Sequence, residues 1–130
     1  MVKTLTLEGA RIRDIASFYA EVNRVFMAGE DWTLGPSLDA LDDLLRGGYG
    51  AIRGREPVRI VWKDMAASRS AFGVAATAAY LRAKLDRPDL FNAERIGRQL
   101  DAVECGAGPT YFDTVLQILA DDPNIDLIAA

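Results

Sequence analysis

The chain has no histidine and a single cysteine among its 130 residues. Without histidine, Ser-His-Asp and Cys-His catalysis, the usual zinc sites and the commonest general base are excluded. The thiol of Cys105 has no histidine to activate it, so we interpret Cys105 as a small, partly buried hydrophobic residue. One cysteine cannot form an internal disulfide bond, which favours a reducing compartment and therefore the cytoplasm.

Long hydrophobic runs and an excess of positive charge are also missing. No stretch approaches the length needed to span a bilayer, so we expect no association with a membrane. The segment 1–9 holds one lysine and no long apolar run, and we expect a strand there rather than a secretory signal. The 19 acidic residues outnumber the 15 basic ones and give a net charge of −4. Because this charge opposes attraction to phosphate backbones, we expect no direct nucleic-acid partner and favour a cationic one.

Half of the residues are hydrophobic, which is enough for one core and predicts a single domain over residues 1–130. Alternating or β-branched residues predict three strands, at 2–8, 57–63 and 125–129. Apolar residues at helical spacing, with capping and breaking residues around them, predict helices at 14–27, 36–46, 64–71, 73–85, 89–104 and 110–120. Strands joined by helices indicate an α/β fold with a three-stranded parallel sheet and helices packed on it.

The most informative stretch is GPSLDALDDLLRGG, residues 35–48. Taken as a helix that starts near Pro36, it carries a leucine stripe for burial and, on the adjoining side, a row of carboxylates. The stripe consists of Leu38, Leu41 and Leu45, and the carboxylates are Asp39, Asp42 and Asp43. Glycines after the helix predict a flat exit loop that another surface can approach. The stretch therefore indicates a recognition surface for a basic partner.

Other interpretations of these carboxylates stay open from residue types alone. Oxygen ligands suit a divalent cation, but this spacing is weak support for a metal site. A solvated helix face, with Asp42 paired to Arg46, is the plainer alternative. The glycine-rich loop 47–56 matches neither phosphate-binding pattern, because no Lys-Ser or Lys-Thr follows and Arg53 stands where a third glycine is required. We therefore expect no cofactor, no metal site and no enzymatic activity.

Four aromatic residues are expected to have packing roles. Such rings pack in a core or an interface more often than they bind a cofactor. They are Trp32, Tyr49, Trp62 and Tyr111.

The order of these parts resembles the barstar family, intracellular inhibitors of a secreted bacterial ribonuclease. The resemblance is carried by residues 35–48 together with EGARIRDI at 8–15, PVRIVWK at 57–63 and TVLQILADDPNIDLIAA at 114–130. It covers about two thirds of the chain. The segment from about 72 to 108 has no counterpart and is expected to be a helical insertion in the same domain.

The resemblance implies a function, because in this family an acidic helix and the loop before it plug the nuclease active site. Carboxylates there occupy the place of RNA phosphates. Asp39 and Asp43 match the family's interface aspartates, Gly47 matches the glycine that follows, and Asp121 falls where the last helix offers a glutamate. The implied protein is a bacterial antitoxin or immunity protein that blocks a basic ribonuclease or related toxin.

Several positions depart from the family pattern. Thr33, Leu34 and Gly48 stand where the family has aromatic residues, and a helix tryptophan is Asp42. Ser37 replaces an asparagine, and Arg46 adds a positive charge among the acids. These changes remove apolar anchors, so we do not expect the family's best-known nuclease as the partner. The alternative function is an interaction or regulatory module of the same fold with a partner that is not a nuclease.

We hypothesise that Trp32 and Tyr49 substitute for the lost rings. The residues expected at the partner surface are Trp32, Thr33, Ser37, Asp39, Asp42, Asp43, Gly47, Gly48 and Asp121.

Overall fold

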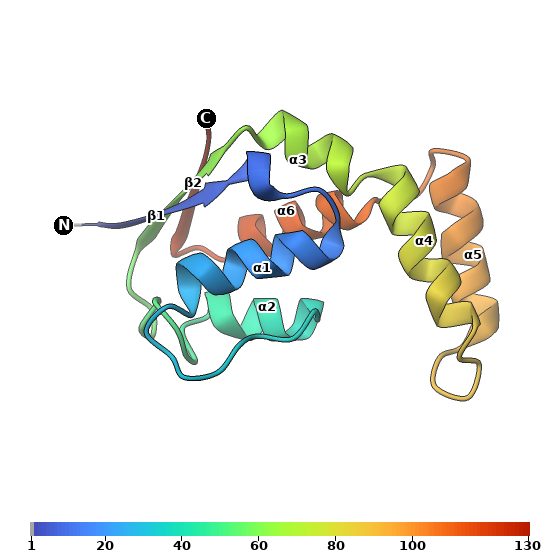
Figure 1. The fold of residues 1–130 in the computed structure, drawn as a ribbon, viewed down its shortest axis with the longest axis horizontal. Coiled ribbons are helices and arrows are strands. Elements are labelled where there is room, and N and C mark those ends of the chain that lie inside the picture. The colour runs from blue at the N-terminus through green and yellow to red at the C-terminus, as the bar shows by residue number, and fades with distance from the viewer. Residues whose placement is uncertain (1) are drawn as a thin grey trace.

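The computed structural model describes residues 2–130 and contains a three-stranded parallel sheet with six α-helices in that range (Figure 1). The strands lie in the order β1, β2, β3. Their bounds are Lys3–Glu8 for β1, Val58–Lys63 for β2 and Ile125–Ala129 for β3. The helices are α1 at Ile15–Phe26, α2 at Leu38–Leu45, α3 at Met65–Ala71, α4 at Val74–Leu85, α5 at Ala93–Glu104 and α6 at Tyr111–Asp121. The predicted α/β class and parallel sheet are confirmed.

The central strand β2 shows why the helices cover one face of the sheet. Val58, Ile60 and Trp62 are buried, whereas Arg59 and Lys63 are exposed on the other face. Successive side chains of a strand point to opposite faces, so one face meets the core and the other meets solvent. Figure 1 shows α1, α2 and α6 together on the covered side of the sheet.

Aromatic rings fill the centre of this core. The Trp62 ring stacks on Phe18 and Phe72, and Phe112 meets Trp62 edge to face. The indole Nε1–H of Trp62 donates a hydrogen bond to Ser68 Oγ at 3.0 Å, so the buried ring keeps its polar atom satisfied. The interpretation of Trp62 as a core residue is therefore confirmed.

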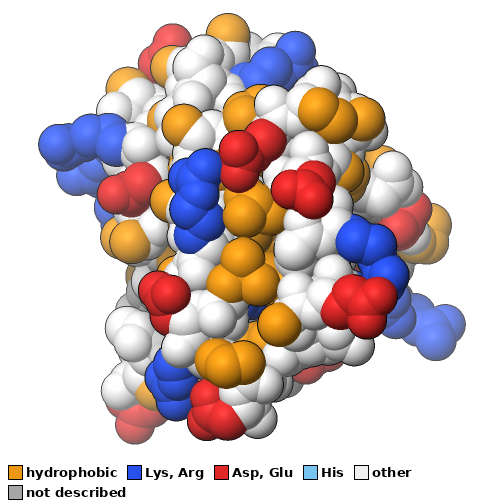
Figure 2. Space-filling view, turned by 90° about the vertical axis from the view of Figure 1, so that its right-hand side faces the viewer, with side chains coloured by type: hydrophobic (Ala, Val, Ile, Leu, Met, Phe, Trp, Pro, Cys, Tyr) orange, Lys and Arg blue, Asp and Glu red, His pale blue; other side chains and the backbone are white. Residues whose placement is uncertain are grey.

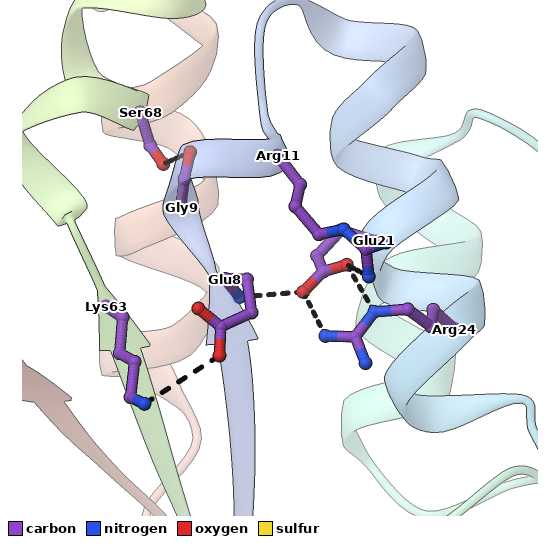
Figure 3. A network of polar contacts seen from close by, with 7 residues as sticks. All are labelled: Glu8, Gly9, Arg11, Glu21, Arg24, Lys63 and Ser68. Carbon is purple, nitrogen blue, oxygen red and sulfur yellow. Dashed lines mark hydrogen bonds and ion pairs between the residues drawn. The ribbon is translucent and has the colours of Figure 1, made fainter.

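Helix α1 is fastened to β1 by a buried carboxylate, that of Glu21 (Figure 3). Glu21 accepts a hydrogen bond from the backbone N–H of Glu8 at 2.7 Å and two from the Arg24 guanidinium at 2.6 and 2.7 Å. The guanidinium of Arg11 lies 3.9 Å from the same carboxylate. A charged group in the core is stable only with such partners, so this contact fixes where α1 lies on the sheet.

The pair α4 and α5 forms a hairpin at one end of the molecule, apart from the sheet (Figure 1). It has a small apolar cluster of its own, made of Leu81, Ile96 and Val103. The hairpin falls within the segment 72–108 that we expect as an insertion.

Two helices begin more than one residue later than the sequence predicts. Helix α2 starts at Leu38 rather than near Pro36, because Ser37 Oγ accepts the backbone N–H of Ala40 and caps the helix there. Helix α5 starts at Ala93 rather than at residue 89, because Asn92 provides the cap. The Asp14 cap of α1 is confirmed, with Asp14 accepting from the backbone N–H of Ser17 at 2.8 Å.

Cys105 is exposed, so the expectation that it is partly buried is wrong. The residue follows the last turn of α5 as its C-cap, and its thiol donates to the carbonyl of Ala102. A position at the end of a surface helix leaves the side chain outside the core.

Candidate partner-binding surface

Helix α2 carries the residues that the sequence singles out, and the structure decides which of them face the core. Leu41, Leu44 and Leu45 are buried, and Leu44 is fully enclosed. Leu38 is only partly buried but packs against the core, and the predicted stripe omits the buried Leu44. Residues 41, 44 and 45 point to the same side of the helix, and residue 38 lies at the margin of that side.

The two carboxylates opposite this core side are those of Asp39 and Asp43, which we call the acidic face. Both residues are exposed. Asp42 lies nearer the core and pairs with Arg46, whose Nε is 3.2 Å from the Asp42 carboxylate. Arg46 therefore neutralises Asp42 rather than the acidic face. The predicted pairing of Asp42 with Arg46 is confirmed.

Trp32 and Tyr49 lie against each other beside α2, and we call them the aromatic pair. Their ring centroids are 4.9 Å apart in an edge-to-face arrangement. The hydroxyl of Tyr49 donates to the carbonyl of Ala40 on α2 at 2.7 Å. Trp32 keeps 44% of its surface exposed, so the pair offers an apolar ring to solvent next to the helix.

Tyr49 also marks how close the acidic face lies to the aromatic pair. Partial burial and the negative charge of Asp43 both raise the pKa of the Tyr49 phenol above its usual value. A charge acts on a neighbouring ionisable group in this way only at short range. The Tyr49 hydroxyl also bonds to Ala40 on the helix that carries Asp43, so the aromatic pair and Asp43 lie near each other.

The loop before α2 is held by a side chain that the sequence analysis did not identify. Asn23 of α1 accepts the backbone N–H of Leu34 at 2.6 Å and donates to the Leu34 carbonyl at 3.1 Å. Leu34 is buried in the core, while Thr33 next to it is exposed. These two hydrogen bonds between Asn23 and Leu34 therefore position Trp32 and Thr33 beside the helix.

The exit from α2 depends on Gly47 for its shape. Gly47 has a φ of +85°, and a Cβ there would overlap the backbone of Gly54. Only glycine combines that backbone conformation with that close approach. Gly48 is exposed, and a Cβ there would meet only the carbonyl oxygen of Asp43, at 3.5 Å.

Two predicted surface residues have local roles within the protein. Ser37 is exposed, and its side-chain oxygen caps α2. Asp121 ends α6 and accepts a hydrogen bond from the side-chain amide of Gln117 at 2.8 Å. Within residues 2–130 no hydrogen bond or ion pair joins Asp121 to α2, and its place in the surface stays a prediction.

Between residues 2 and 130, no three Cys, Asp or Glu side chains gather as a candidate metal site. No helix in that range is both long and apolar enough to cross a bilayer.

The parallel sheet and its helical connections define an α/β protein of barstar-like fold. The family model for barstar, the barnase inhibitor, matches residues 2–86, which is more than half of the chain. The chain therefore belongs to the barstar family, whose members inhibit ribonucleases. No curated protein matches the chain. Because the match ends just after α4, within the segment 72–108, the bounds of the expected insertion stay a prediction.

Proposed function

We propose that this protein inhibits a basic ribonuclease or related toxin by placing α2 in the enzyme's active site. The observation that carries the proposal is the exposed acidic face, Asp39 and Asp43, with the aromatic pair directly beside it. A nuclease active site binds phosphates through arginines and lysines, and carboxylates satisfy the same cations. The protein acts by charge mimicry and catalyses nothing itself.

The aromatic pair takes over the role of the family's missing rings in this proposal. Charges steer association and fix the orientation, whereas buried aromatic side chains are frequent hot spots of affinity at an interface. Trp32 is the exposed ring, and it lies against Tyr49, which bonds to α2. The partner is therefore expected to present a basic cleft with an apolar edge.

The test is inhibition of RNA hydrolysis. The purified protein is titrated against a panel of basic ribonucleases and ribonuclease toxins, with barnase among them. We expect stoichiometric inhibition of the cognate enzyme and loss of inhibition in the Asp39→Ala/Asp43→Ala double variant. If the protein binds no ribonuclease of the panel or of its native cell, the proposal fails.

A second function is favoured by one observation. Thr33 and Gly48 occupy positions of family aromatics, both are exposed, and neither carries a ring. An interface built for a different partner explains that change, so the alternative is a regulatory module of the same fold with a partner that is not a nuclease. Copurification of a partner without ribonuclease activity, lost in the same double variant, would favour this alternative.

The acidic face predicts that association with the partner depends strongly on salt. Exposed charges steer encounters over a Debye length, which is about 10 Å at 0.1 M salt and about 3 Å at 1 M. The association rate constant should therefore fall as ionic strength rises, with the dissociation rate changing much less. Stopped-flow measurements on the cognate pair check this, and an association rate that is flat with salt would contradict it.

A separate prediction concerns catalysis and the single thiol. The protein should show no turnover of RNA, and Cys105→Ser should leave partner binding unchanged, because Cys105 lies at the end of α5 rather than on α2. We place the protein in the cytoplasm, where a single exposed thiol stays reduced. Metal-dependent hydrolysis that Asp39→Asn or Asp42→Asn abolishes would overturn the non-enzymatic interpretation.

A further inference from the structure

A groove of about 750 Å³ opens between the α4–α5 hairpin and the first turn of α6. Leu38 at the start of α2 closes one side of it. Figure 2 views the molecule from the end at which α4 and α5 lie, and shows hydrophobic side chains in a central band with charged side chains around it. A cavity of this volume is within the range that binds ligands, about 300–1,000 Å³.

The groove has an apolar floor and an apolar mouth. Leu81, Ile96 and Val103, the cluster that joins α4 to α5, lie at its floor. Leu90 and Phe91, in the turn between the two helices, lie at its mouth with 60% and 36% of their surfaces exposed. Exposed apolar side chains that continue an apolar groove, rather than standing alone, are typical of an interaction site.

The charged side chains that line the groove are all basic, although acidic side chains lie farther out on the same face (Figure 2). Lys84, Arg95 and Arg98 line it, and no aspartate or glutamate does, although acidic residues outnumber basic ones in the chain. Within residues 2–130 only Arg98 of these three pairs with a carboxylate, that of Glu94. The charge complement of the groove is therefore an anion.

Lys84 is held in place rather than free to turn into solvent. Its ammonium lies 4.5 Å from the ring centre of Tyr80 and 5.1 Å from that of Phe91. A cation over aromatic faces is stabilised there and keeps its hydrogen-bond donors for another partner. Lys84 thus fixes a positive charge at the apolar mouth.

We propose that the groove binds an acidic, apolar segment of another protein. A large aliphatic or aromatic side chain of that segment covers the floor, between α4 and α5. A neighbouring carboxylate reaches Lys84 and Arg95. The groove includes neither Asp39 nor Asp43 and is opposite in charge to the acidic face, so the proposal does not rest on inhibition of a nuclease.

The surroundings favour a protein segment over nucleic acid. Nucleic acid needs rows of cations that follow its phosphates, and the net charge of −4 opposes a polyanion as a whole. Here three cations surround a mainly apolar floor. An apolar side chain next to a carboxylate fits both features at once.

The proposal is tested by the fluorescence anisotropy of a short fluorescein-labelled peptide in which leucine and phenylalanine alternate with glutamate. We expect saturable binding, and about tenfold weaker affinity for the Lys84→Gln/Arg95→Gln double variant, since loss of two partly exposed charge pairs corresponds to about 1.4 kcal/mol. The matched control is Arg53→Gln/Arg55→Gln, which removes the same charge from exposed loop positions outside the groove. A control peptide carries lysine in place of each glutamate.

Several outcomes would overturn the proposal. These are equal binding of the two peptides, no saturable binding, an equal response of the two double variants, and displacement of the peptide by a single-stranded oligonucleotide. If sedimentation shows a dimer that Lys84→Gln/Arg95→Gln abolishes, a second copy of the chain occupies the groove instead. Asp43→Ala should leave peptide affinity unchanged, which separates this result from the nuclease test.

Discussion

Replacing Asp43 by alanine should weaken binding of the cognate partner by about 2–5 kcal/mol while leaving the protein nearly as stable. Asp43 is exposed, and its charge is felt by Tyr49 of the aromatic pair. In the complex that we propose, its carboxylate is expected to be buried among arginines or lysines that the substitution leaves unpaired. The range is typical of charge pairs buried at protein interfaces, the family's own barnase complex among them.

The weaker binding of Asp43→Ala should appear mainly as faster dissociation. Association is governed by the summed charge of the acidic face, of which Asp39 remains, so the association rate falls only modestly. The larger change is expected in the dissociation rate, because mutations at one interface act mainly there. Surface plasmon resonance of wild type and Asp43→Ala against the cognate partner measures both rates.

Asp42→Ala is the matched control on the same helix. Asp42 pairs with Arg46 at 3.2 Å on the surface, and exposed pairs of this kind contribute only about 0–1 kcal/mol. Its removal should therefore change dissociation far less than removal of Asp43. Equal and small effects of the two substitutions, with unchanged thermal melts, would mean that the acidic face is only a solvated helix surface.

The strands and most helices could be predicted because their signals are local. The β-branched residues of 57–63 predict β2 to within one residue, and the Asp14 cap predicts the start of α1. The failure at α2 has the same local origin. Pro36 suits a first helical turn, but Ser37 is the better cap, and capping decides where the helix begins.

The surroundings of the candidate site depend on contacts between residues distant in the chain. The sequence suggests that Trp32 and Tyr49 replace lost rings, but not that they touch or that Tyr49 bonds to α2. No pattern in the neighbouring sequence indicates that Asn23 bonds to the loop before α2. The groove is assembled from residues between 38 and 114, so its single sign of charge is visible only once the chain is folded.

Glu21 is another residue that sequence patterns do not identify, because a glutamate on a helix is usually solvated. Only the fold brings it against the backbone N–H of Glu8 and between two guanidinium groups. Burial alone would raise the pKa of Glu21, but the hydrogen bonds from Arg24 and Glu8 and the charges of Arg24 and Arg11 lower it below its usual value. The ionised form is therefore favoured by folding.

Replacing Glu21 by alanine should reduce the free energy of unfolding by about 3 kcal/mol at neutral pH. Removal of one partner from a buried ion pair costs about 3–5 kcal/mol, and the lower end applies because Arg24 remains 45% exposed and regains water. Glu21→Gln keeps an acceptor for the Glu8 N–H and should lose less. Urea unfolding of the three proteins measures these differences.

The pH dependence distinguishes loss of the charge from simple loss of packing. A glutamate with a lowered pKa in the folded state contributes stability above its unfolded pKa, about 4.3, and that contribution is lost as pH falls through the lower folded value. The stability gap between wild type and Glu21→Ala should therefore be full at neutral pH and narrow below about pH 4. A gap that stays constant into that acidic range would show that Glu21 stabilises α1 on β1 through packing rather than through its charge.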